Sequence, residues 1–345
     1  MRKLMIVATV MLSVLLITSC GEEETQDLTT PQDLTTLNTY LVEQDLDLTD
    51  MLDGWIITAE AVHNDLDSYY VIDTRSEDAY NAGHIPGAVF ADATTLLDVA
   101  ADNGGKTILV HCYKGIGAAR YLVALRLSGY TDAKSLKFGM SAWGLSDADD
   151  GAVYDKWTGA TSDIALDYPE DWLTSFTDPA EDVVYDYPVI ATEEVEDGAA
   201  LLAERVDALL TDGYGYASTP DILTDREAYF INNYWAQTDY EHYGHIAGAH
   251  RIVNNADDGE TFNLENGGIN KYDPNATVVT YCWTSQTSGV ITAYLTVLGY
   301  DAQSLIYGAN GMIWSNLESH KWNATTGTPG QNAPGVYELE ATPAQ

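Results

Sequence analysis

Short runs dominated by apolar residues alternate along the chain with longer stretches of helical periodicity. The runs at 69–73, 107–111 and 277–281 (YYVID, TILVH and TVVTY) are typical of strands buried on both faces. The stretches at 118–130 and 289–300 place apolar residues at helical spacing and end near a glycine, as helices commonly do. Because such strands alternate with helices, we predict an α/β fold with parallel sheets covered by helices.

The pattern occurs twice with matched spacing. The segment at 71–89 (VIDTRSEDAYNAGHIPGAV) resembles the one at 229–250 (YFINNYWAQTDYEHYGHIAGAH), and a strand ending in cysteine follows each. A Gly-Tyr pair lies 17 and 18 residues after Cys112 and after Cys282. Matching order and spacing indicate a duplicated domain. We place the domains at 51–150 and 191–325, joined by a linker at 151–190 that packs on a domain.

The two ends of the chain have their own patterns. Residues 1–19 combine a basic start, an apolar stretch and small residues, which is typical of an export signal. The run Ile17-Thr18-Ser19-Cys20 resembles the bacterial lipobox, which implies that Cys20 is lipidated and anchors the protein in the cell envelope. An uncleaved membrane anchor needs about 20 apolar residues, more than this stretch contains. We predict a polar spacer at 20–50 and a loose tail at 326–345.

Gly21 follows the lipobox where an aspartate would signal inner-membrane retention, so an outer-membrane anchor is favoured. The chain has 15 basic and 53 acidic residues, a formal net charge of −38. Such a surface repels nucleic acid and anionic head groups, so we expect no nucleic-acid partner and membrane contact only through the lipid. The acidic run DADDG at 147–151 lacks the spacing of a calcium loop, and no cluster has zinc spacing.

Cys112 stands where the strand at 107–111 ends and a helix is about to begin. Ligands bind at the carboxyl ends of parallel strands, where loop amides and the helix N-terminus favour an anion. A thiolate is therefore favoured over a thiol. Gly115 and Gly117 let the backbone wrap closely around the sulfur, and Lys114 adds a cation for an anionic substrate. The arrangement is typical of an activated nucleophile.

With these residues the chain resembles the tandem-domain rhodaneses, which are thiosulfate sulfurtransferases. The resemblance rests on Asp73-Thr74-Arg75, on GHIPGA at 83–88 with its counterpart GHIAGA at 244–249, and on the loop after each cysteine. It implies two rhodanese-like domains, each a five-stranded parallel sheet with helices on both faces. It also implies a cysteine persulfide intermediate, with no metal and no organic cofactor.

The resemblance assigns the nucleophile role to Cys112 and Cys282. It implies that the residues that follow them form the anion-binding loops: Tyr113, Lys114, Gly115, Ile116, Gly117 and Ala118 in the first half, and Trp283, Thr284, Ser285, Gln286, Thr287 and Ser288 in the second. Four further residues, Asp73, Arg75, His84 and His245, are interpreted as structural supports near the sites.

The implied reaction moves sulfane sulfur from thiosulfate or a similar small donor to a thiophilic acceptor. An alternative stays open, in which the chain is a persulfide carrier or binding module for an envelope redox or sulfur-carrier protein. The familiar tandem enzymes keep the cysteine only in the C-terminal half, whereas this chain has one in each half. The second half has Ile231-Asn232-Asn233 near the place of the Asp-x-Arg motif and Thr284 in place of Lys114, so we expect the better anion site at Cys112.

Two rival interpretations involve the same cysteines. Dual-specificity phosphatases share the fold and have a Cys-x5-Arg loop, but the sixth residue after the two cysteines here is Ala118 or Ser288. A disulfide between Cys112 and Cys282 is permitted in an exported protein. It requires Cα atoms within about 7 Å, which two loops in separate domains do not favour.

Overall fold

The computed structural model describes residues 30–144, 154–175, 177–181, 183–192, 197–254, 263–265 and 267–342. The expected export signal, the expected lipidation residue Cys20 and the DADDG run lie outside the described residues. Within the described part of the chain, none of the helices combines the length and the apolar character needed to cross a membrane.

The first domain is built on a five-stranded parallel sheet with strand order β2-β6-β5-β3-β4. Its strands are β2 (Ile56–Ile57), β3 (Tyr69–Asp73), β4 (Val89–Phe90), β5 (Thr107–His111) and β6 (Lys134–Leu136). Alternate residues of β5 enter different cores, because Ile108 and Val110 face the helices between the domains and Leu109 faces the opposite side. Both faces of the sheet are buried, as the apolar runs predict.

The second domain has a four-stranded parallel sheet, so the expectation of five strands is wrong here. The strand order is β10-β12-β13-β9, formed by β9 (Gly215–Ala217), β10 (Tyr229–Asn233), β12 (Thr277–Tyr281) and β13 (Ala302–Leu305). Only a single parallel bridge, between Asn232 and His250, marks the place of a fifth strand. The side chain of Asn232 donates to the Ile252 carbonyl oxygen and accepts from the Ile252 N–H, so a side chain replaces the backbone ladder there.

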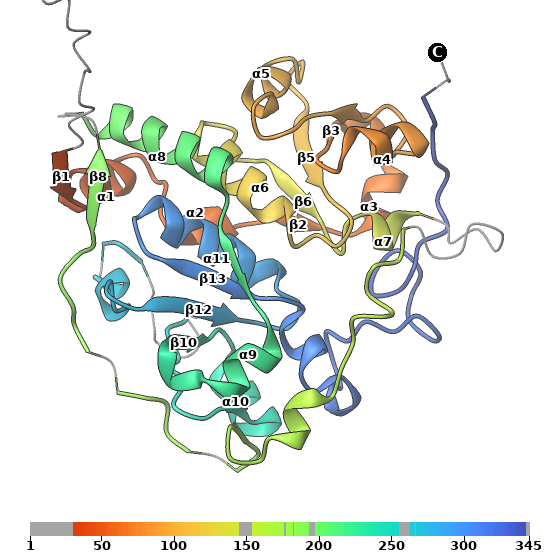
Figure 1. The fold of residues 1–345 in the computed structure, drawn as a ribbon. Helices are drawn as coiled ribbons and strands as arrows, with labels where there is room; N and C mark the ends of the chain where they lie inside the picture. Colours follow the sequence, from red (N-terminus) through yellow and green to blue (C-terminus); the bar gives the residue numbers. More distant parts are fainter. Residues whose placement is uncertain are drawn as a thin grey trace, which may run out of the picture.

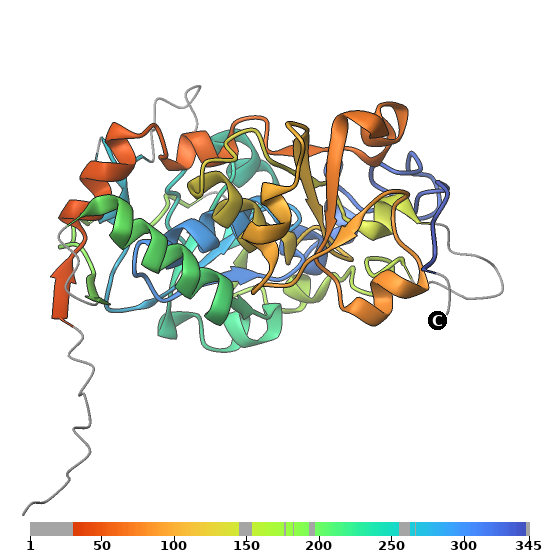
Figure 2. The same cartoon turned by 90° about the horizontal axis from the view of Figure 1, so that it is seen from above.

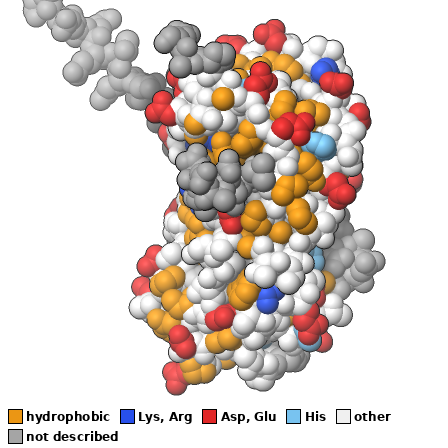
Figure 3. Space-filling view, turned by 90° about the vertical axis from the view of Figure 1, so that its right-hand side faces the viewer, with side chains coloured by type: hydrophobic (Ala, Val, Ile, Leu, Met, Phe, Trp, Pro, Cys, Tyr) orange, Lys and Arg blue, Asp and Glu red, His pale blue; other side chains and the backbone are white. Residues whose placement is uncertain are grey.

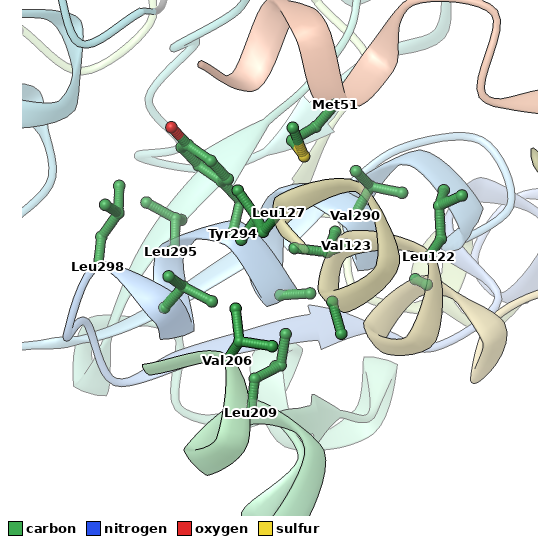
Figure 4. Packing of buried hydrophobic residues seen from close by; sticks show 14 of the residues in the cluster. Met51, Leu122, Val123, Leu127, Val206, Leu209, Val290, Tyr294, Leu295 and Leu298 are labelled. Carbon is green, nitrogen blue, oxygen red and sulfur yellow. The ribbon is translucent and has the colours of Figure 1, made fainter. Parts of the chain in front are cut away.

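The helices that follow the two cysteine strands pack together between the two sheets (Figure 1). These are α6 (Ala118–Leu127) and α11 (Gln286–Val297), with α8 (Gly198–Asp212) and α2 (Leu48–Leu52) beside them. Figure 4 shows the apolar side chains that the four helices contribute: Met51, Leu122, Val123, Leu127, Val206, Leu209, Val290, Tyr294, Leu295 and Leu298. This shared core holds the two domains against each other.

The other helices pack around the two sheets, on their faces and at their ends. In the first domain they are α3 (Ala59–Asn64), α4 (Glu77–Ala82), α5 (Leu96–Ala101) and α7 (Met140–Trp143). In the second they are α9 (Thr219–Thr224) and α10 (Gln237–Tyr243). Buried residues of α3 and α7 pack on the outer face of the first sheet, and those of α9 on the outer face of the second.

Residues 30–50 are not the polar spacer that their composition predicts. They form β1 (Thr30–Asp33), α1 (Thr35–Glu43) and the start of α2, and β1 pairs antiparallel with β8 (Val189–Thr192). Leu37, Leu41 and Leu48 are fully buried in the core between the domains. The polar majority of the segment concealed a stripe of leucines at helical spacing, and burying that stripe stabilises the helices.

The C-terminal residues, expected to be loose, pack along the first domain. Figure 1 and Figure 2 show this dark blue segment running beside α7 and the orange helices. The Tyr337 ring stacks on His63 with centroids 4.4 Å apart and lies beside Trp143. The backbone of Glu340 exchanges two hydrogen bonds with that of His84, at 2.8 and 2.9 Å. The tail therefore completes the outer face of the first domain.

The linker packs on the domains, in agreement with its interpretation from sequence. Its strand β7 (Trp172–Leu173) pairs antiparallel with β11 (His245–Ile246) of the second domain. The Trp157 side chain is fully buried in the outer core of the first domain, and its Nε1 donates to the Lys114 carbonyl oxygen at 3.1 Å. The linker thus contacts the backbone of the first cysteine loop.

Candidate active site

The backbone of the first cysteine loop is clamped by the segment that follows β6. The Met140 N–H donates to the Cys112 carbonyl oxygen at 2.9 Å, and the Ser141 N–H donates to the Tyr113 carbonyl oxygen at 3.0 Å. Gly139 has a φ of 55°, and a Cβ at this residue would collide with the Cys112 carbonyl oxygen. Glycine is therefore required for the two backbones to approach this closely.

The Cys112 thiol opens into a pocket of about 290 Å³ at the boundary between the domains. The first domain contributes Thr74, Gly117, Arg120 and Tyr121, and the second domain contributes Tyr214 and Tyr216. A Cβ built on Gly117 would lie 3.7 Å from the Cys112 Sγ and 3.8 Å from the Tyr216 hydroxyl oxygen. The missing side chain of Gly117 leaves the space beside the thiol and this hydroxyl open.

The sequence predicted Lys114 as the cation of this pocket, but the basic residue that lines it is Arg120. Arg120 lies in the first turn of α6, and its Nη2 donates to the Tyr121 hydroxyl at 2.7 Å. Lys114 instead donates from its Nζ to the hydroxyl of Tyr307 in the second domain, at 3.1 Å, and does not line the pocket. Arg120 forms no ion pair with a carboxylate of the described residues, so its charge is available to an anionic ligand.

Asp73 and Arg75 form a buried ion pair beside the loop. Arg75 Nη2 is 2.6 Å from Asp73 Oδ2, and Nε lies 3.0 and 3.1 Å from the two carboxylate oxygens. Nη2 also donates to the Gly83 carbonyl oxygen at 2.6 Å. The guanidinium carbon lies 5.0 Å from the centre of the Tyr113 ring, a cation–π distance. The pair joins the cysteine loop to the GHIPGA motif and does not reach the pocket.

His111, the last residue of β5, is fully buried beside Asp73, with its Nε2 3.7 Å from the carboxylate. Burial lowers the pKa of His111 to about 4, so its imidazole is neutral at pH 7. Burial acts to raise the pKa of Asp73, but the neighbouring His111 and Arg75 outweigh burial, and the pKa lies below its usual value. At neutral pH the standing charges are therefore the Asp73 carboxylate and the Arg75 guanidinium.

His84 and His245 occupy matched positions and order their loops. The His84 ring stacks on Tyr80 with centroids 4.0 Å apart, and the His245 ring stacks on Tyr240 at 3.9 Å. His84 Nδ1 lies 2.8 Å from the Tyr80 carbonyl oxygen, and His245 Nε2 lies 2.7 Å from the Thr177 Oγ1. Burial lowers the pKa of His245 to about 4. Neither histidine lines the Cys112 pocket.

Cys282 has the same place in the second domain, but its thiol is enclosed. The Ala309 N–H donates to the Cys282 carbonyl oxygen at 3.0 Å, as Met140 does for Cys112. Cys282 is 2% exposed, and its Sγ accepts from the Ser288 N–H at 3.3 Å. Ser285 has a φ of 60° where Gly115 has 77°, so the second loop turns the same way without glycine. Both thiols are free, and no disulfide joins them.

Three substitutions distinguish the surroundings of Cys282 from those of Cys112. The counterparts of Asp73, Thr74 and Arg75 are Asn233, Tyr234 and Trp235. They lie two residues further along the chain than the sequence suggested. The equivalence follows from the backbone, because the N–H of Thr74 and the N–H of Tyr234 each donate, at 2.9 Å, to the carbonyl oxygen of the last residue in the strand before the cysteine of their own domain. Burial raises the pKa of Tyr234 to about 12, and the neighbouring Cys282 acts in the same direction. Tyr234 therefore occupies the backbone position that Thr74 has in the first domain.

The buried charges of the first domain have neutral replacements. Asn233 donates to the Tyr281 hydroxyl at 2.7 Å, in place of the contact between Asp73 and His111. The Trp235 ring stacks on Trp283 with centroids 4.4 Å apart. The second domain thus keeps the frame of the site with Asn233 and Trp235 at the places of the Asp73–Arg75 ion pair.

The remaining residues of the two loops have structural contacts. Ile116 and Ala118 are buried, and the Ile116 carbonyl oxygen accepts from the Tyr214 hydroxyl at 2.9 Å. In the second loop, the hydroxyls of Ser285 and Ser288 lie 2.7 and 2.9 Å from the Ser304 Oγ. A different pocket between the domains is lined by Trp283, Thr284, Gln286 and Thr287.

Sequence reasoning missed four residues that line the Cys112 pocket, namely Arg120, Tyr121, Tyr214 and Tyr216. Arg120 lies beyond the loop, and only the first turn of α6 brings it back to the thiol. Its signal was a lone basic residue just inside a predicted helix. Tyr214 and Tyr216 come from the other domain, and a local sequence pattern does not predict which residues meet across two domains.

The family described as Rhodanese-like domain matches residues 58–146 and 231–312. Thiosulfate sulfurtransferase GlpE of Pseudomonas fluorescens is 36% identical over 77 residues, which cover 21% of this chain and 68% of that protein. The enzyme of the same name from Pseudoalteromonas translucida is 32% identical over 83 residues, 23% of this chain and 76% of that protein.

Solved structures include a thiosulfate sulfurtransferase from Pseudomonas aeruginosa, 14% identical, with 89% of this chain and 48% of that chain covered and a TM-score of 0.27. A rhodanese-related protein from Thermoplasma volcanium is 20% identical, with 26% of this chain and 89% of that chain covered and a TM-score of 0.24. The matches to both halves and to the curated relatives agree with the two cysteine-loop domains described above. The chain belongs to the rhodanese family of sulfurtransferases, as a member with two rhodanese-like domains.

Proposed function

We propose that this chain is a thiosulfate sulfurtransferase that works through a persulfide on Cys112. The observation that carries the proposal is the contrast between the two thiols. Cys112 opens into a pocket that contains Arg120, whereas Cys282 is 2% exposed beside Tyr234. A nucleophile has to reach its substrate, so the exposed thiol is the one assigned to the reaction.

In the first half-reaction the Cys112 thiolate attacks the outer sulfur of thiosulfate. A new sulfur–sulfur bond forms, the sulfur–sulfur bond of thiosulfate breaks, and sulfite leaves with the bonding electron pair. Arg120 is placed to bind the oxygens of the donor and of the leaving sulfite, since its guanidinium lines the pocket without a carboxylate partner among the described residues. The hydroxyl of Tyr216 is a further hydrogen-bond donor in the same pocket.

In the second half-reaction a thiophilic acceptor, such as cyanide, attacks the outer sulfur of the persulfide. The acceptor takes that sulfur, and the Cys112 thiolate returns with the electron pair. Sulfur passes through the enzyme without net oxidation, so no further reactant is needed. Because the enzyme is modified between the two steps, the kinetics are expected to be ping-pong.

The second domain acts as the wall of the first domain's site in this proposal. Tyr214 and Tyr216 line the Cys112 pocket, and the Tyr214 hydroxyl donates to the Ile116 carbonyl oxygen of the cysteine loop. The tandem rhodaneses that the chain resembles keep their cysteine in the C-terminal half. Here the roles of the two halves are exchanged.

Thiocyanate formation from thiosulfate and cyanide tests the assignment. Cys112→Ala is expected to abolish the activity, because the covalent path is lost, and Cys282→Ala is expected to retain most of it. A dead Cys282→Ala variant beside an active Cys112→Ala variant would contradict the proposal. If the wild type forms a stable persulfide but turns over no small acceptor, the alternative role of persulfide carrier, handing sulfur to an envelope redox or sulfur-carrier protein, is the correct one.

We further propose that the chain is anchored in the cell envelope through a lipid on Cys20, with the outer membrane favoured. The support is the lipobox-like run that ends at Cys20 and the glycine after it. Among the described residues, β1 is the first element and begins at Thr30, ten residues after Cys20.

A further inference from the structure

A second pocket, of about 360 Å³, lies between the domains and includes neither cysteine. The first domain contributes β2 and the residues just after β6, and the second domain contributes the loop at 283–287 together with His320. Three aromatic side chains, those of Trp55, Phe138 and Trp283, form apolar walls. The proposed sulfur transfer does not use this pocket.

The charge inside the pocket is opposite to that of the protein as a whole. Acidic side chains are spread over the face in Figure 3, and the chain has 53 acidic residues. No acidic residue lines this pocket, whose one fixed cation is Lys137. Lys137 forms no ion pair with the described carboxylates, and its Nζ lies 5.5 Å from the centre of the Phe138 ring. The ammonium is therefore partly removed from water without a counter-charge.

The other polar groups of the pocket add hydrogen-bonding atoms and no negative charge. The His320 ring stacks on Trp283 with centroids 5.0 Å apart. Burial and then the charge of Lys137 lower the pKa of His320, which agrees with the two side chains lying near each other. The lining also includes the hydroxyl side chains of Thr58 and Thr287, which donate hydrogen bonds readily.

We propose that this pocket binds a small organic anion, with its carboxylate or sulfonate on Lys137 and its apolar or aromatic body against Trp55, Phe138 and Trp283. The apolar walls exclude a fully hydrated inorganic ion as the best ligand, because such an ion leaves them uncovered. The unpaired ammonium selects an anion over a neutral molecule of the same shape.

The ligand would lie next to the Cys112 loop without reaching the thiol. Gln286 lines this pocket, and its Oε1 accepts from the Phe138 N–H at 2.7 Å. The same side chain packs against Gly115, where a Cβ would collide with it. The pocket is thus separate from the Cys112 pocket but shares a wall with its loop.

The test measures, by fluorine NMR, the binding of 4-fluorobenzoate to the full chain. Neutral 4-fluorobenzamide, which has nearly the same shape, is the matched uncharged probe. The wild type is expected to bind the benzoate saturably and more tightly than the amide. Lys137→Gln is expected to raise the dissociation constant of the benzoate about ten- to a hundredfold, the effect of one charge-assisted hydrogen bond. Lys137→Arg keeps the charge and is expected to retain binding.

Two further variants locate the site. Lys106→Gln removes an exposed lysine elsewhere and is expected to leave binding unchanged. Arg120→Gln removes the cation of the Cys112 pocket and is also expected to leave binding unchanged. The proposal is overturned if the wild type shows no saturable binding, if benzoate and benzamide bind equally, or if Lys137→Gln binds like the wild type. Loss of binding in Arg120→Gln with retention in Lys137→Gln would assign the ligand to the other pocket.

Discussion

Replacing Arg120 by Gln tests which cation binds the sulfur donor. The guanidinium lines the Cys112 pocket and has no carboxylate partner among the described residues, so its removal leaves a donor anion without a charge-assisted contact. One such contact contributes about 1.5–3 kcal/mol. If the contact persists in the transition state, kcat/KM for thiosulfate falls about ten- to a hundredfold. The hydrogen bond from Arg120 to Tyr121 is also lost, which allows the ring some movement.

The assay is steady-state thiocyanate formation at varied thiosulfate concentration, for the wild type and three variants. Lys114→Gln removes the cation that the sequence favoured, and because Lys114 bonds to Tyr307 we expect a smaller loss from it than from Arg120→Gln. Arg226→Gln is the matched control, because it breaks a partly exposed ion pair between Arg226 of the second domain and Asp171 of the linker. The reasoning is refuted if Arg120→Gln stays within about threefold of the wild type, or if Lys114→Gln is the more damaging of the two.

Three other predictions use different parts of the molecule. Tyr234→Thr introduces the residue that the first domain has at this place, so the Cys282 thiol is expected to react faster with a disulfide reagent in the folded protein; an unchanged rate in the variant would count against the tyrosine as a cause of its burial. Buried His111, with a pKa of about 4, binds a proton less readily in the folded protein than in the unfolded chain, where its pKa is about 6.5. The free energy of unfolding is therefore expected to fall by about 3 kcal/mol from this residue as the pH drops from 6.5 to 4. Urea unfolding at pH 7 and at pH 4 gives the change in the free energy of unfolding between the two pH values. This change is expected to be smaller for His111→Gln than for the wild type, and an equal change in both proteins would contradict the assignment to His111. Cys20→Ser is expected to release the protein from the membrane fraction or leave it unprocessed, and unchanged lipid labelling would argue against the anchor.

The sequence was informative where physical patterns are local. Strands buried on both faces have to be apolar throughout, so the runs at 107–111 and 277–281 identified the central strands, and the repeat placed both cysteines at strand ends. The leucines of α1 were hidden by polar neighbours, because a narrow apolar stripe barely alters average composition. The missing fifth strand depends on the side chain of Asn232, whose bonding no periodicity records.

The pocket could be predicted only in part, for a geometric reason. The sequence predicted a glycine-containing loop between Cys112 and a helix, and in the structure Gly117 lies beside the thiol just before α6. Lys114 was favoured because it is adjacent in sequence, yet the loop directs its side chain toward Tyr307. Two of the other residues that line the pocket lie outside the loop. Arg120 comes from the first turn of α6, and Tyr216 lies about a hundred residues after Cys112 in the sequence.

The most direct test of the account is to find the cysteine that carries the transferred sulfur. The protein is incubated with thiosulfate, freed of excess donor and digested, and each cysteine peptide is weighed for the added sulfur, about 32 Da. The account predicts this increase on the peptide that contains Cys112, its loss on addition of cyanide, and no increase on the peptide that contains Cys282. A persulfide found on Cys282, with none on Cys112, would contradict the central claim that the first domain performs the chemistry.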